Sequence, residues 1–247
     1  MHHTVGTIGG AALAAAALLA APSLATPAKA KIPDLSGMWL AKPGSVLIKM
    51  TSEGWPPPFL PKAREIFDKT QAAEKRGEPI ADNVTNCSPH GVPRIMGAPF
   101  PIKIMQTQDE VVLLHEAHHL NRIIYLNEQH PKDLDPTYLG HSIGHWEGDA
   151  LIVDTVALND KTVIDRNGIT HSDVLHVIEK FTLADDGKLL RDFITVDDPK
   201  TFTKPWSYTI EFNKRPDIRL MEYVCDYNID AAEAGVAISI GSKKGAE

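Results

Sequence analysis

The stretch DVLHVIEKFTLADDGKLLRDFITV, residues 173–196, decides the fold class. In its first half Leu175, Val177 and Phe181 fall on one face of an extended chain, with polar residues between them. The DDG at residues 185–187 favours a tight turn between antiparallel strands, and a second apolar run follows at once. We therefore predict a β-hairpin in this stretch.

The same alternation of short apolar segments and turn-forming residues covers most of the chain after residue 101. Short strands at such spacing predict an all-β sandwich or closed barrel, and closure removes exposed edge strands. Because the connections are short, we expect the strands to follow one another as a meander. Further strands are expected at residues 110–115, 121–125, 207–212 and 218–227, and residues 143–155 are expected to hold two strands joined by a tight turn at Glu147-Gly148-Asp149.

The part of the chain before residue 102 is expected to hold one helix and long loops. Residues 62–77 combine many charges with a few apolar side chains, and the sequence Gly-Glu-Pro at 77–79 ends the helix. Trp39, on a short strand, is expected to fill the core. Residues 83–101 are rich in Pro, Gly and Asn, which is typical of a structured loop.

Residues 1–30 are predicted to be a secretory signal peptide, followed by a single domain over residues 31–247. Residues 5–21 are almost entirely small or apolar and carry no charge, and Ala28-Lys29-Ala30 forms an A-x-A cleavage site. The apolar run is shorter than the roughly 18–20 residues that a membrane span prefers. We expect a periplasmic or secreted protein without membrane contact after cleavage. An uncleaved N-terminal anchor is the alternative.

The charge and the cysteine content narrow the function classes. The net charge is −7 and no cluster of Lys and Arg stands out, which disfavours nucleic acid as a partner. Cys87 and Cys225 form an even pair in an apparently exported chain, so we predict one disulfide between them. Two buried free thiols are the alternative.

Residues 115–119, His-Glu-Ala-His-His, match the pattern H-E-x-x-H. A zinc site of this kind needs a helix, on which the two outer histidines share one face. The flanking residues favour strands instead, where His115 and His119 would lie about 13 Å apart. We expect a hairpin with polar histidines at its turn. A zinc hydrolase, with Glu128 or His130 as a further ligand, is the alternative.

Residues 141–147, His-Ser-Ile-Gly-His-Trp-Glu, carry a second group of polar side chains. On an extended strand His141, His145 and Glu147 share one face, whereas Trp146 points to the other. Two histidines and a carboxylate on one face supply a general base together with a partner that orients it. A solvated strand face without a function is the alternative.

The connection of residues 159–176 is longer and richer in titratable groups than a plain link between strands needs. Asp173 follows His171 by two residues, close enough to set the tautomer of the imidazole. Ser172 lacks the glycine-rich elbow of a hydrolase nucleophile. We interpret this connection as the wall of a site; an Asn/Asp/Ser turn that satisfies its own backbone is the alternative.

Tyr223 is expected on the last long strand, next to Glu222, and supplies a phenol to the set of candidate side chains. The chain has no glycine-rich phosphate loop and no flavin or nicotinamide fingerprint. An enzyme with this sequence is therefore expected to work without an organic cofactor or a metal.

Four motifs resemble those of a large family of exported proteins from sphingomonads and acidobacteria. They are PDLSGxW at residues 33–39, GHSIGxWEGD at 140–149, HSDxLH at 171–176 and DPxxFTKPW at 198–206. The resemblance spans nearly the whole mature chain and implies an all-β, lipocalin-like antiparallel barrel of about eight strands that encloses one small ligand. A looser similarity to the phenylcoumaran γ-formaldehyde lyase of lignin-degrading sphingomonads implies cofactor-independent C–C cleavage.

We therefore expect a cofactor-independent lyase that acts on lignin-derived aromatic small molecules and releases formaldehyde or a similar aldehyde. His171, oriented by Asp173, is expected to take a proton from a substrate hydroxyl, and His145 or Tyr223 to return or guide it. A non-catalytic carrier of a small apolar ligand is the alternative, and a homo-oligomer is left open. The residues expected to bind the substrate are His141, Trp146, Glu147, Lys161, Asp165, Arg166 and His176, with Lys161 or Arg166 at a phenolate.

Overall fold

The computed structural model describes residues 1–4, 6, 32–44, 47–78, 80, 82, 85 and 87–225. The chain divides into two units, residues 1–30 and residues 31–247, and the second unit carries the fold. The predicted signal peptide with its cleavage site lies almost wholly outside the described residues. Among the residues that are described, no helix is both long and apolar enough to cross a membrane.

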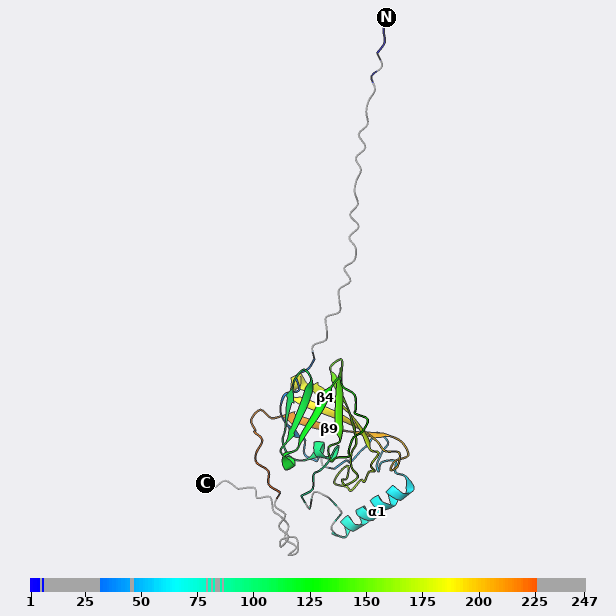
Figure 1. Ribbon diagram of the computed structural model, residues 1–247, viewed down its shortest axis with the longest axis vertical. Coiled ribbons are helices and arrows are strands. Elements are labelled where there is room, and N and C mark those ends of the chain that lie inside the picture. Colours follow the sequence, from blue (N-terminus) through cyan, green and yellow to red (C-terminus); the bar gives the residue numbers. More distant parts are fainter. Residues whose placement is uncertain are drawn as a thin grey trace. The chain divides into compact units, whose positions relative to one another are not determined.

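The described residues form nine strands that close into one barrel in chain order (Figure 1). The first and the last strand pair with each other, with Trp39 opposite Lys214, and this pairing completes the closure. The predicted all-β barrel is thereby confirmed. The strands are β1 (Gly37–Ala41), β2 (Ile102–Gln106), β3 (Glu110–His115), β4 (Asn121–Leu126), β5 (His141–Glu147), β6 (Ala150–Val156), β7 (His176–Ala184), β8 (Leu189–Asp197) and β9 (Trp206–Lys214).

The β7–β8 hairpin lies where the sequence predicts it. The two strands pair along their full lengths, from His176 opposite Asp197 to Ala184 opposite Leu189. Asp185, Asp186 and Gly187 form a short turn of 3-10 helix, η4, and all three have positive φ. Asp and Gly are the residue types that tolerate this backbone conformation best, which explains the strength of the hairpin signal.

One pair of neighbouring strands departs from the predicted antiparallel meander. β4 and β5 run parallel, with Ile124 opposite Ser142 and Leu126 opposite Gly144. A parallel pair requires the chain to return along the length of the strands before it can re-enter the sheet. The connection of residues 127–140 makes this return, and it brings polar side chains back to the start of β5.

The strand predicted at residues 218–227 is wrong over its described part, residues 218–225, which contain no strand. The barrel is already closed by the pairing of β9 with β1, so no free edge remains for a further strand. Instead, the chain after β9 crosses the end of the barrel. The backbone N–H of Arg215 donates to the carbonyl of Met38 at 2.8 Å.

The predicted helix forms as α1 (Pro61–Lys75), which lies outside the barrel near one end (Figure 1). Pro61 starts it, where a missing N–H costs nothing, and Ala63 and Phe67 are its buried residues. Phe67 contacts Phe59 with ring centroids 5.0 Å apart, and Phe59 contacts Phe202 at 5.3 Å. This row of aromatic rings holds the helix against the barrel. Two further short 3-10 helices are η2 (Arg94–Gly97) and η3 (Ala117–His119).

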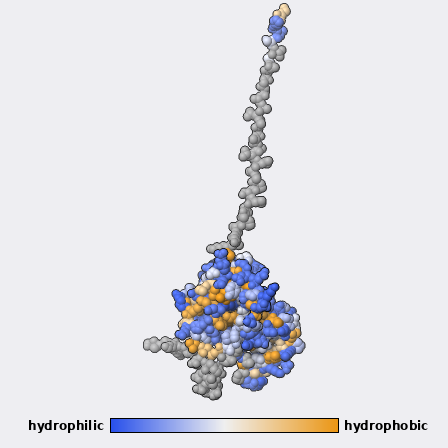
Figure 2. All heavy atoms as spheres, in the orientation of Figure 1, coloured by the Kyte–Doolittle hydropathy of each residue, from blue (hydrophilic) through white to orange (hydrophobic). Residues whose placement is uncertain are grey.

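Because successive side chains on a strand point to opposite faces, every second side chain of the barrel strands points into the interior. Trp39 and Trp206 are 0% and 1% exposed, and Phe181 and Phe212 are each 1% exposed. Helix η2 adds Met96, whose sulfur accepts a hydrogen bond from an inward-pointing side chain of β4. These side chains belong to one hydrophobic core cluster. Figure 2 shows hydrophobic residues interspersed among hydrophilic ones over the visible face.

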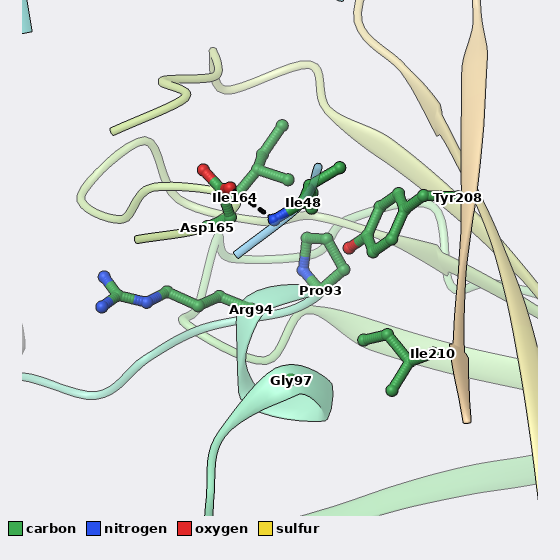
Figure 3. A pocket seen from close by; sticks show the side chains of 8 residues that line it. All are labelled: Ile48, Pro93, Arg94, Gly97, Ile164, Asp165, Tyr208 and Ile210. Carbon is green, nitrogen blue, oxygen red and sulfur yellow. Dashed lines mark hydrogen bonds between the residues drawn. The ribbon is translucent and has the colours of Figure 1, made fainter. Parts of the chain in front are cut away.

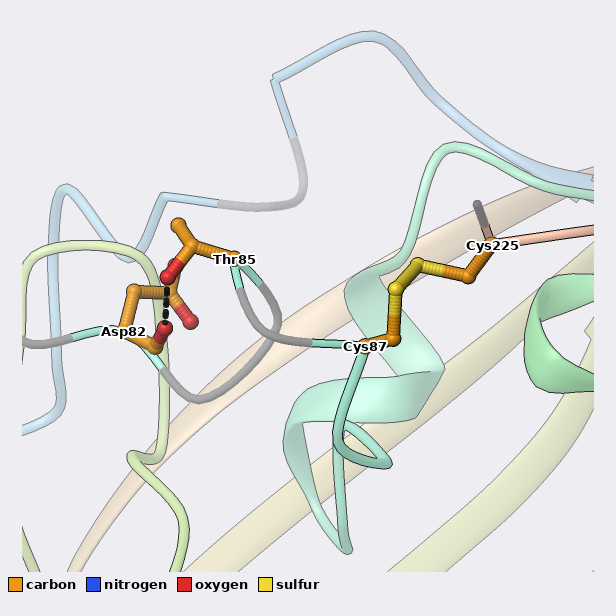
Figure 4. Close-up of a disulfide and its surroundings, with 4 residues drawn as sticks. All are labelled: Asp82, Thr85, Cys87 and Cys225. Atoms are coloured by element: carbon orange, nitrogen blue, oxygen red, sulfur yellow. Dashed lines mark hydrogen bonds between the residues drawn. A yellow bond between two sulfur atoms is a disulfide. The ribbon is translucent and has the colours of Figure 1, made fainter. Parts of the chain in front are cut away.

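The predicted disulfide between Cys87 and Cys225 is present, with Cα atoms 5.7 Å apart (Figure 4). It joins the loop before η2 to the segment that follows β9, across 138 residues of sequence. The bridge holds the end of the described chain against the barrel. Disulfides of this kind persist in oxidising compartments.

Candidate functional site

An open pocket of about 270 Å³ is lined by β4, the start of β5 and the end of the connection between them. Tyr125 lines it from β4 and His141 from β5, and the end of the return connection contributes Thr137, Leu139 and Gly140. Gly140, which precedes β5, has φ +66°, and an added Cβ there would collide with the carbonyl oxygen of Val156. The pocket is lined by Asn121, Arg122, Ile123, Tyr125, Thr137, Leu139, Gly140, His141 and Ser142.

Two aromatic rings form a platform at this pocket. The rings of Tyr125 on β4 and His141 on β5 are stacked, with centroids 5.4 Å apart and planes inclined by 18°. Stacked rings of this kind present a flat apolar surface together with polar atoms at their edges. The platform suits a third flat ring, such as that of a small aromatic ligand.

His141 begins a chain of hydrogen bonds that leads away from the pocket over the outside of the barrel. Its Nδ1 lies 2.8 Å from Nδ1 of His130, which belongs to the return connection. The other ring nitrogen of His130, Nε2, lies 3.2 Å from Oδ1 of Asp154 on β6. The same oxygen lies 2.8 Å from Nε2 of His176 at the start of β7. Four side chains from four segments thus form one continuous relay.

The hydrogen-bonding capacity of these groups assigns the protons of the relay. An ionised Asp154 only accepts, so Nε2 of His130 carries a hydrogen and donates it. With Nδ1 of His130 as the acceptor, the hydrogen between the two histidines belongs to Nδ1 of His141. Nε2 of His141 is left with a free lone pair, and no partner for it is found in the described part of the chain. These tautomers are assigned from the network, as is usual for imidazoles.

The pKa shifts agree with this assignment. Burial lowers the pKa of His141, and the neighbouring His130 lowers it further, so His141 is neutral at pH 7. The hydrogen bond from His176 lowers the pKa of Asp154 and outweighs its partial burial. In turn the hydrogen bond to Asp154 raises the pKa of His176. The site therefore combines an ionised carboxylate with a neutral imidazole that faces the pocket.

Behind the pocket the interior of the barrel holds a buried ion pair. The guanidinium of Arg122, 2% exposed, donates from Nη1 to Glu179 at 2.8 Å and forms a second bond to the other carboxylate oxygen from Nη2. It also donates to the hydroxyls of Ser142 and Thr155, at 3.1 and 2.9 Å. The guanidinium is thus fully engaged inside the barrel, so we assign it to the architecture of the wall and not to ligand binding.

A second carboxyl group, that of Asp192 on β8, is buried beside this ion pair. Both of its oxygens are buried and have no donor partner. Burial and the neighbouring Glu179 carboxylate raise the pKa of Asp192 well above its ordinary value. The raised pKa favours the neutral form of Asp192 beside the ion pair of Arg122 with Glu179.

The structure does not support the predicted pairing of His171 with Asp173. His171 is buried, and its Nε2 lies 2.7 Å from the hydroxyl of Thr162 while its Nδ1 lies 3.0 Å from the carbonyl of Ser172. Asp173 is exposed and pairs with Lys200 at 2.7 Å. The predicted orientation of the imidazole by Asp173 is therefore wrong, because the chain turns the carboxylate outward.

Ser172 also has a partner that explains its place in the motif. Its hydroxyl and its backbone N–H donate to the two oxygens of Asp198, at 2.8 and 2.7 Å. Asp198 is 1% exposed and further accepts from the hydroxyl of Thr201 at 2.7 Å. The motifs at residues 171–176 and 198–206 are thus tied together by one buried carboxylate.

The predicted strand faces at residues 141–147 are confirmed, but most of the strand lies away from the pocket. His145 pairs with Glu147 at 3.0 Å, and both side chains are more than half exposed. His145 lies about 13 Å along the strand from the histidine of the pocket. Trp146 faces inward and packs against the core. Lys161 and Arg166 are exposed.

Asp165 lines a different and much smaller cavity of about 10 Å³, which holds about one water molecule (Figure 3). Its carboxylate accepts from the backbone N–H of Ile48 at 3.0 Å and from both N–H donors of Asn167. Burial nevertheless raises the pKa of Asp165 to about 6. The Tyr208 hydroxyl points into the same cavity, which is too small for an aromatic ring.

Tyr223 lies in the segment after β9, far along the chain from the pocket residues. Its ring contacts those of Phe100 and His118, with centroids 5.2 and 5.1 Å apart. Its backbone N–H donates to Nε2 of His119 at 2.8 Å. Of the predicted site residues, the structure thus brings only His141 and His176 into one relay.

Of the two residues that connect these histidines, sequence reasoning missed Asp154 and considered His130 only as a possible zinc ligand. Asp154 shows only the period-two alternation of β6, on which an outward carboxylate is ordinary. His130 comes from an irregular connection, and nothing local indicates that this connection returns over the sheet. The parallel pairing of β4 with β5 creates the contact.

No protein-family model matches this chain, and no curated protein is significantly similar to it in sequence. The family resemblance stated above therefore stays a prediction that rests on the four motifs.

Proposed function

We propose that this protein is a periplasmic or secreted, cofactor-independent lyase that binds a small aromatic molecule in the pocket beside β4. In this proposal His141 is the general base, and lignin-derived aromatics with a hydroxymethyl group are the substrate class. The observation that carries the proposal is the relay from His141 through His130 and Asp154 to His176, which ends in an open pocket. The disulfide supports an oxidising compartment.

The size and the walls of the pocket support an aromatic ligand. A volume of about 270 Å³ accommodates one substituted ring, and the open side leaves the rest of a larger molecule outside. The stacked rings of Tyr125 and His141 offer a third ring an apolar face. This arrangement fits one ring of an aromatic dimer better than an unbranched aliphatic chain.

The proposed reaction transfers one proton and breaks one C–C bond. Nε2 of His141 takes the proton from the substrate hydroxyl, and the O–H electron pair becomes the second bond of the aldehyde carbonyl. The electron pair of the breaking C–C bond moves to the remaining carbon, where the aromatic system delocalises it. The protonated His141 then returns its proton to that carbon, so the products are formaldehyde and the shortened aromatic.

The relay supports His141 in this role. When His141 takes up a proton, its Nδ1–H remains bonded to His130, which in turn donates to the ionised Asp154. The Asp154 carboxylate stabilises the positive charge of the protonated His141 through two hydrogen bonds, as a carboxylate does when it orients a catalytic histidine. His130 and Asp154 are positioning residues in this mechanism, because neither lines the pocket.

The proposal is tested by incubating the purified protein with a panel of hydroxymethyl-bearing lignin-type aromatic dimers and analysing the products by mass spectrometry. We expect a product that has lost one formaldehyde unit. His141→Gln should abolish its formation, because the amide cannot accept the proton. Lys180→Gln is the matched surface control, since Lys180 is exposed on β7 and lies outside the pocket. Turnover that survives in His141→Gln would refute the assignment of the base.

A carrier without catalytic activity is the second candidate function. A separate open pocket of about 310 Å³ lies between the segment before residue 51 and β9, and its lining includes the apolar side chains of Leu47, Met50 and Ile210. A carrier would retain an aromatic dimer unchanged, with a binding affinity that His141→Gln leaves as it is. Retention lost in Ile210→Asp but kept in His141→Gln would favour the carrier over the lyase.

A further inference from the structure

One edge of β9 is hydrogen-bonded only near its two ends. β1 pairs with β9 over Phe212–Lys214, and the backbone N–H of Lys42, just after β1, donates to the carbonyl of Glu211 at 2.8 Å. The next hydrogen bonds along this edge come at Ser207, whose carbonyl accepts from the backbone N–H of Ser52 at 2.8 Å and whose N–H donates to the Ser52 hydroxyl at 2.9 Å. The described chain leaves this edge of β9 open between Ser207 and Glu211.

Thr209 lies in the middle of this open edge. Along an antiparallel strand every second residue directs both its N–H and its C=O to the same side, so those of Thr209 point the same way as those of Ser207. Neither group has a hydrogen-bond partner among the residues that the structure describes. An unpaired N–H and C=O on the edge of a strand are a template for a further extended backbone.

The chain that passes opposite Thr209 leaves room for such a backbone. From residue 42 to residue 52 it takes ten residues to accompany a stretch that β9 covers in four. Because of this excess length the chain cannot stay paired with the strand, and an open pocket of about 310 Å³ lies between the two. Thr209 lines this pocket together with Tyr208 and Ile210, and Leu47 and Met50 contribute apolar side chains from the other chain segment. A donor and an acceptor beside apolar walls are the usual make-up of a ligand site.

Hydrogen bonds to the connection of residues 159–176 anchor this chain to a different part of the fold. The backbone N–H of Ile48 donates to the carboxylate of Asp165 at 3.0 Å, and the Ile48 carbonyl accepts from the side-chain amide of Asn167 at 3.0 Å. Figure 3 shows the Ile48 nitrogen directed at Asp165. Both backbone groups of Ile48 are thus engaged elsewhere, so they do not close the gap at Thr209.

The length of the open edge favours a ligand of a single amino-acid residue with blocked ends. Ser207 and Glu211 lie about 13 Å apart at ~3.3 Å per residue, and both are already hydrogen-bonded. A residue that faces Thr209 exchanges both backbone hydrogen bonds with it, as in any hydrogen-bonded antiparallel pair. An acyl group and an amide at its two ends extend the ligand to about 7 Å, which fits within the gap, whereas an extended tripeptide of the same kind spans about 13 Å and reaches the occupied ends.

We propose that this pocket binds a small amide that presents the N–H and the C=O of one amino-acid residue and carries an apolar side chain. The N–H of Thr209 donates to the ligand carbonyl, and the carbonyl of Thr209 accepts from the ligand N–H. Leu47 and Met50 cover the apolar part of the ligand. This site is separate from the pocket beside β4 and does not depend on the proposed lyase activity. A carried aromatic dimer would contact the same pocket through its apolar surface and would not require the Thr209 N–H.

Isothermal titration calorimetry of the purified protein with N-acetyl-leucine N-methylamide tests the proposal. We expect one equivalent of this amide to bind. Thr209→Pro should weaken binding at least fivefold, because proline lacks the N–H that donates to the ligand. Proline is tolerated at such a position of a strand, since this N–H takes no part in the ladder with β8. Thr209→Val is the matched control, which keeps the N–H and should leave the affinity unchanged.

A second probe tests the same contact if circular dichroism shows that Thr209→Pro does not fold. The analogue methylated at the leucine nitrogen cannot donate to the Thr209 carbonyl, and we expect the unmodified protein to bind it at least fivefold more weakly. His141→Gln should leave the affinity for the amide unchanged, because His141 lines the other pocket. The proposal is overturned if the unmodified protein does not bind the amide, if it binds the methylated analogue equally well, or if folded Thr209→Pro retains full affinity. Loss of binding in His141→Gln would also overturn it, because the ligand would then lie beside β4.

Discussion

His130 and His141 stand near opposite ends of the connection between β4 and β5, yet their Nδ1 atoms lie 2.8 Å apart. The parallel pairing of the two strands forces the chain to return, and this return places an imidazole over the sheet. The contact ties an irregular segment to the outside of the barrel. It also gives the pocket a base whose tautomer is determined by its neighbours.

Asp154→Asn should lower the pKa of His176 towards its ordinary value of about 6.5, because the carboxylate that raises it is removed. A raised folded-state pKa stabilises the protein below pH 6.5, and this contribution is lost as pH rises through the folded-state value. NMR titration of the histidine ring protons measures the pKa of His176 in the unmodified protein and in the Asp154→Asn variant. An unchanged His176 titration would contradict the relay. If the lyase proposal holds, turnover should fall roughly 10²-fold in the same variant.

The protein should lose stability in acid, because His90 and His115 are buried in their neutral forms. Their folded-state pKa values of about 4 and about 3 lie below the unfolded value of 6.5. The unfolded state therefore binds more protons below pH 6.5, and stability falls as pH decreases from there. By pH 4.5, each of the two histidines has lowered the free energy of unfolding by on the order of 2 kcal/mol. Urea unfolding at several pH values measures how the free energy of unfolding falls in acid. His115→Leu should make this fall shallower, and an equally steep fall in that variant would contradict the prediction.

Arg122→Met should destabilise the barrel by about 3–5 kcal/mol, because it leaves the buried Glu179 carboxylate without its partner. Asp192→Asn is the matched comparison on the neighbouring strand. It should change the free energy of unfolding by about 1 kcal/mol or less at pH 7, since burial raises the pKa of Asp192 and favours the neutral carboxyl group, which Asn resembles. Equal losses in the two variants would show that Asp192 is charged.

Replacing both cysteines, Cys87→Ser/Cys225→Ser, should lower the free energy of unfolding by about 4–5 kcal/mol in the chain-entropy account, because the bridge closes a loop of 138 residues. Urea unfolding of the oxidised protein against the double variant measures the loss. A reductant should produce the same loss in the unmodified protein and none in the variant. A loss below about 1 kcal/mol would show that the bridged segment contributes little to the fold.

His171→Gln should reduce stability by about 1–3 kcal/mol, because a buried imidazole loses its bond to the Thr162 hydroxyl. Asp173→Asn should cost less than about 1 kcal/mol, since its ion pair with Lys200 is exposed. Thermal unfolding measures the stability loss in each of the two variants. A fully stable but inactive His171→Gln would restore His171 as the base and contradict the assignment of His141.

Much of the barrel could be predicted from local patterns. Alternation along residues 173–183 and the DDG turn predicted the β7–β8 hairpin, because side-chain direction on a strand depends only on position. The outward face of His141, His145 and Glu147 followed from the same rule. The strand predicted after residue 217 failed, because barrel closure left it no edge to pair with.

The candidate site was harder to predict. We interpreted residues 159–176 as the wall of a site, yet their polar groups mostly secure the loop, as the contact of Ser172 with Asp198 shows. A carboxylate two residues from an imidazole was read as its partner, but the backbone turns Asp173 towards Lys200. Proximity in sequence does not determine the direction of a side chain in an irregular segment.

The sequence by itself determined the elements: the strands with their inward and outward faces, the helix that starts at Pro61, and the two cysteines available for a bridge. These depend on short-range sterics and on the alternation of apolar residues, which are local properties. Only the tertiary structure decided which outward side chains meet. Tyr125 and His130 contact His141 because β4 and β5 pair in parallel and the chain must return between them. Such pairing depends on the closure of the whole barrel, which no single stretch of sequence encodes.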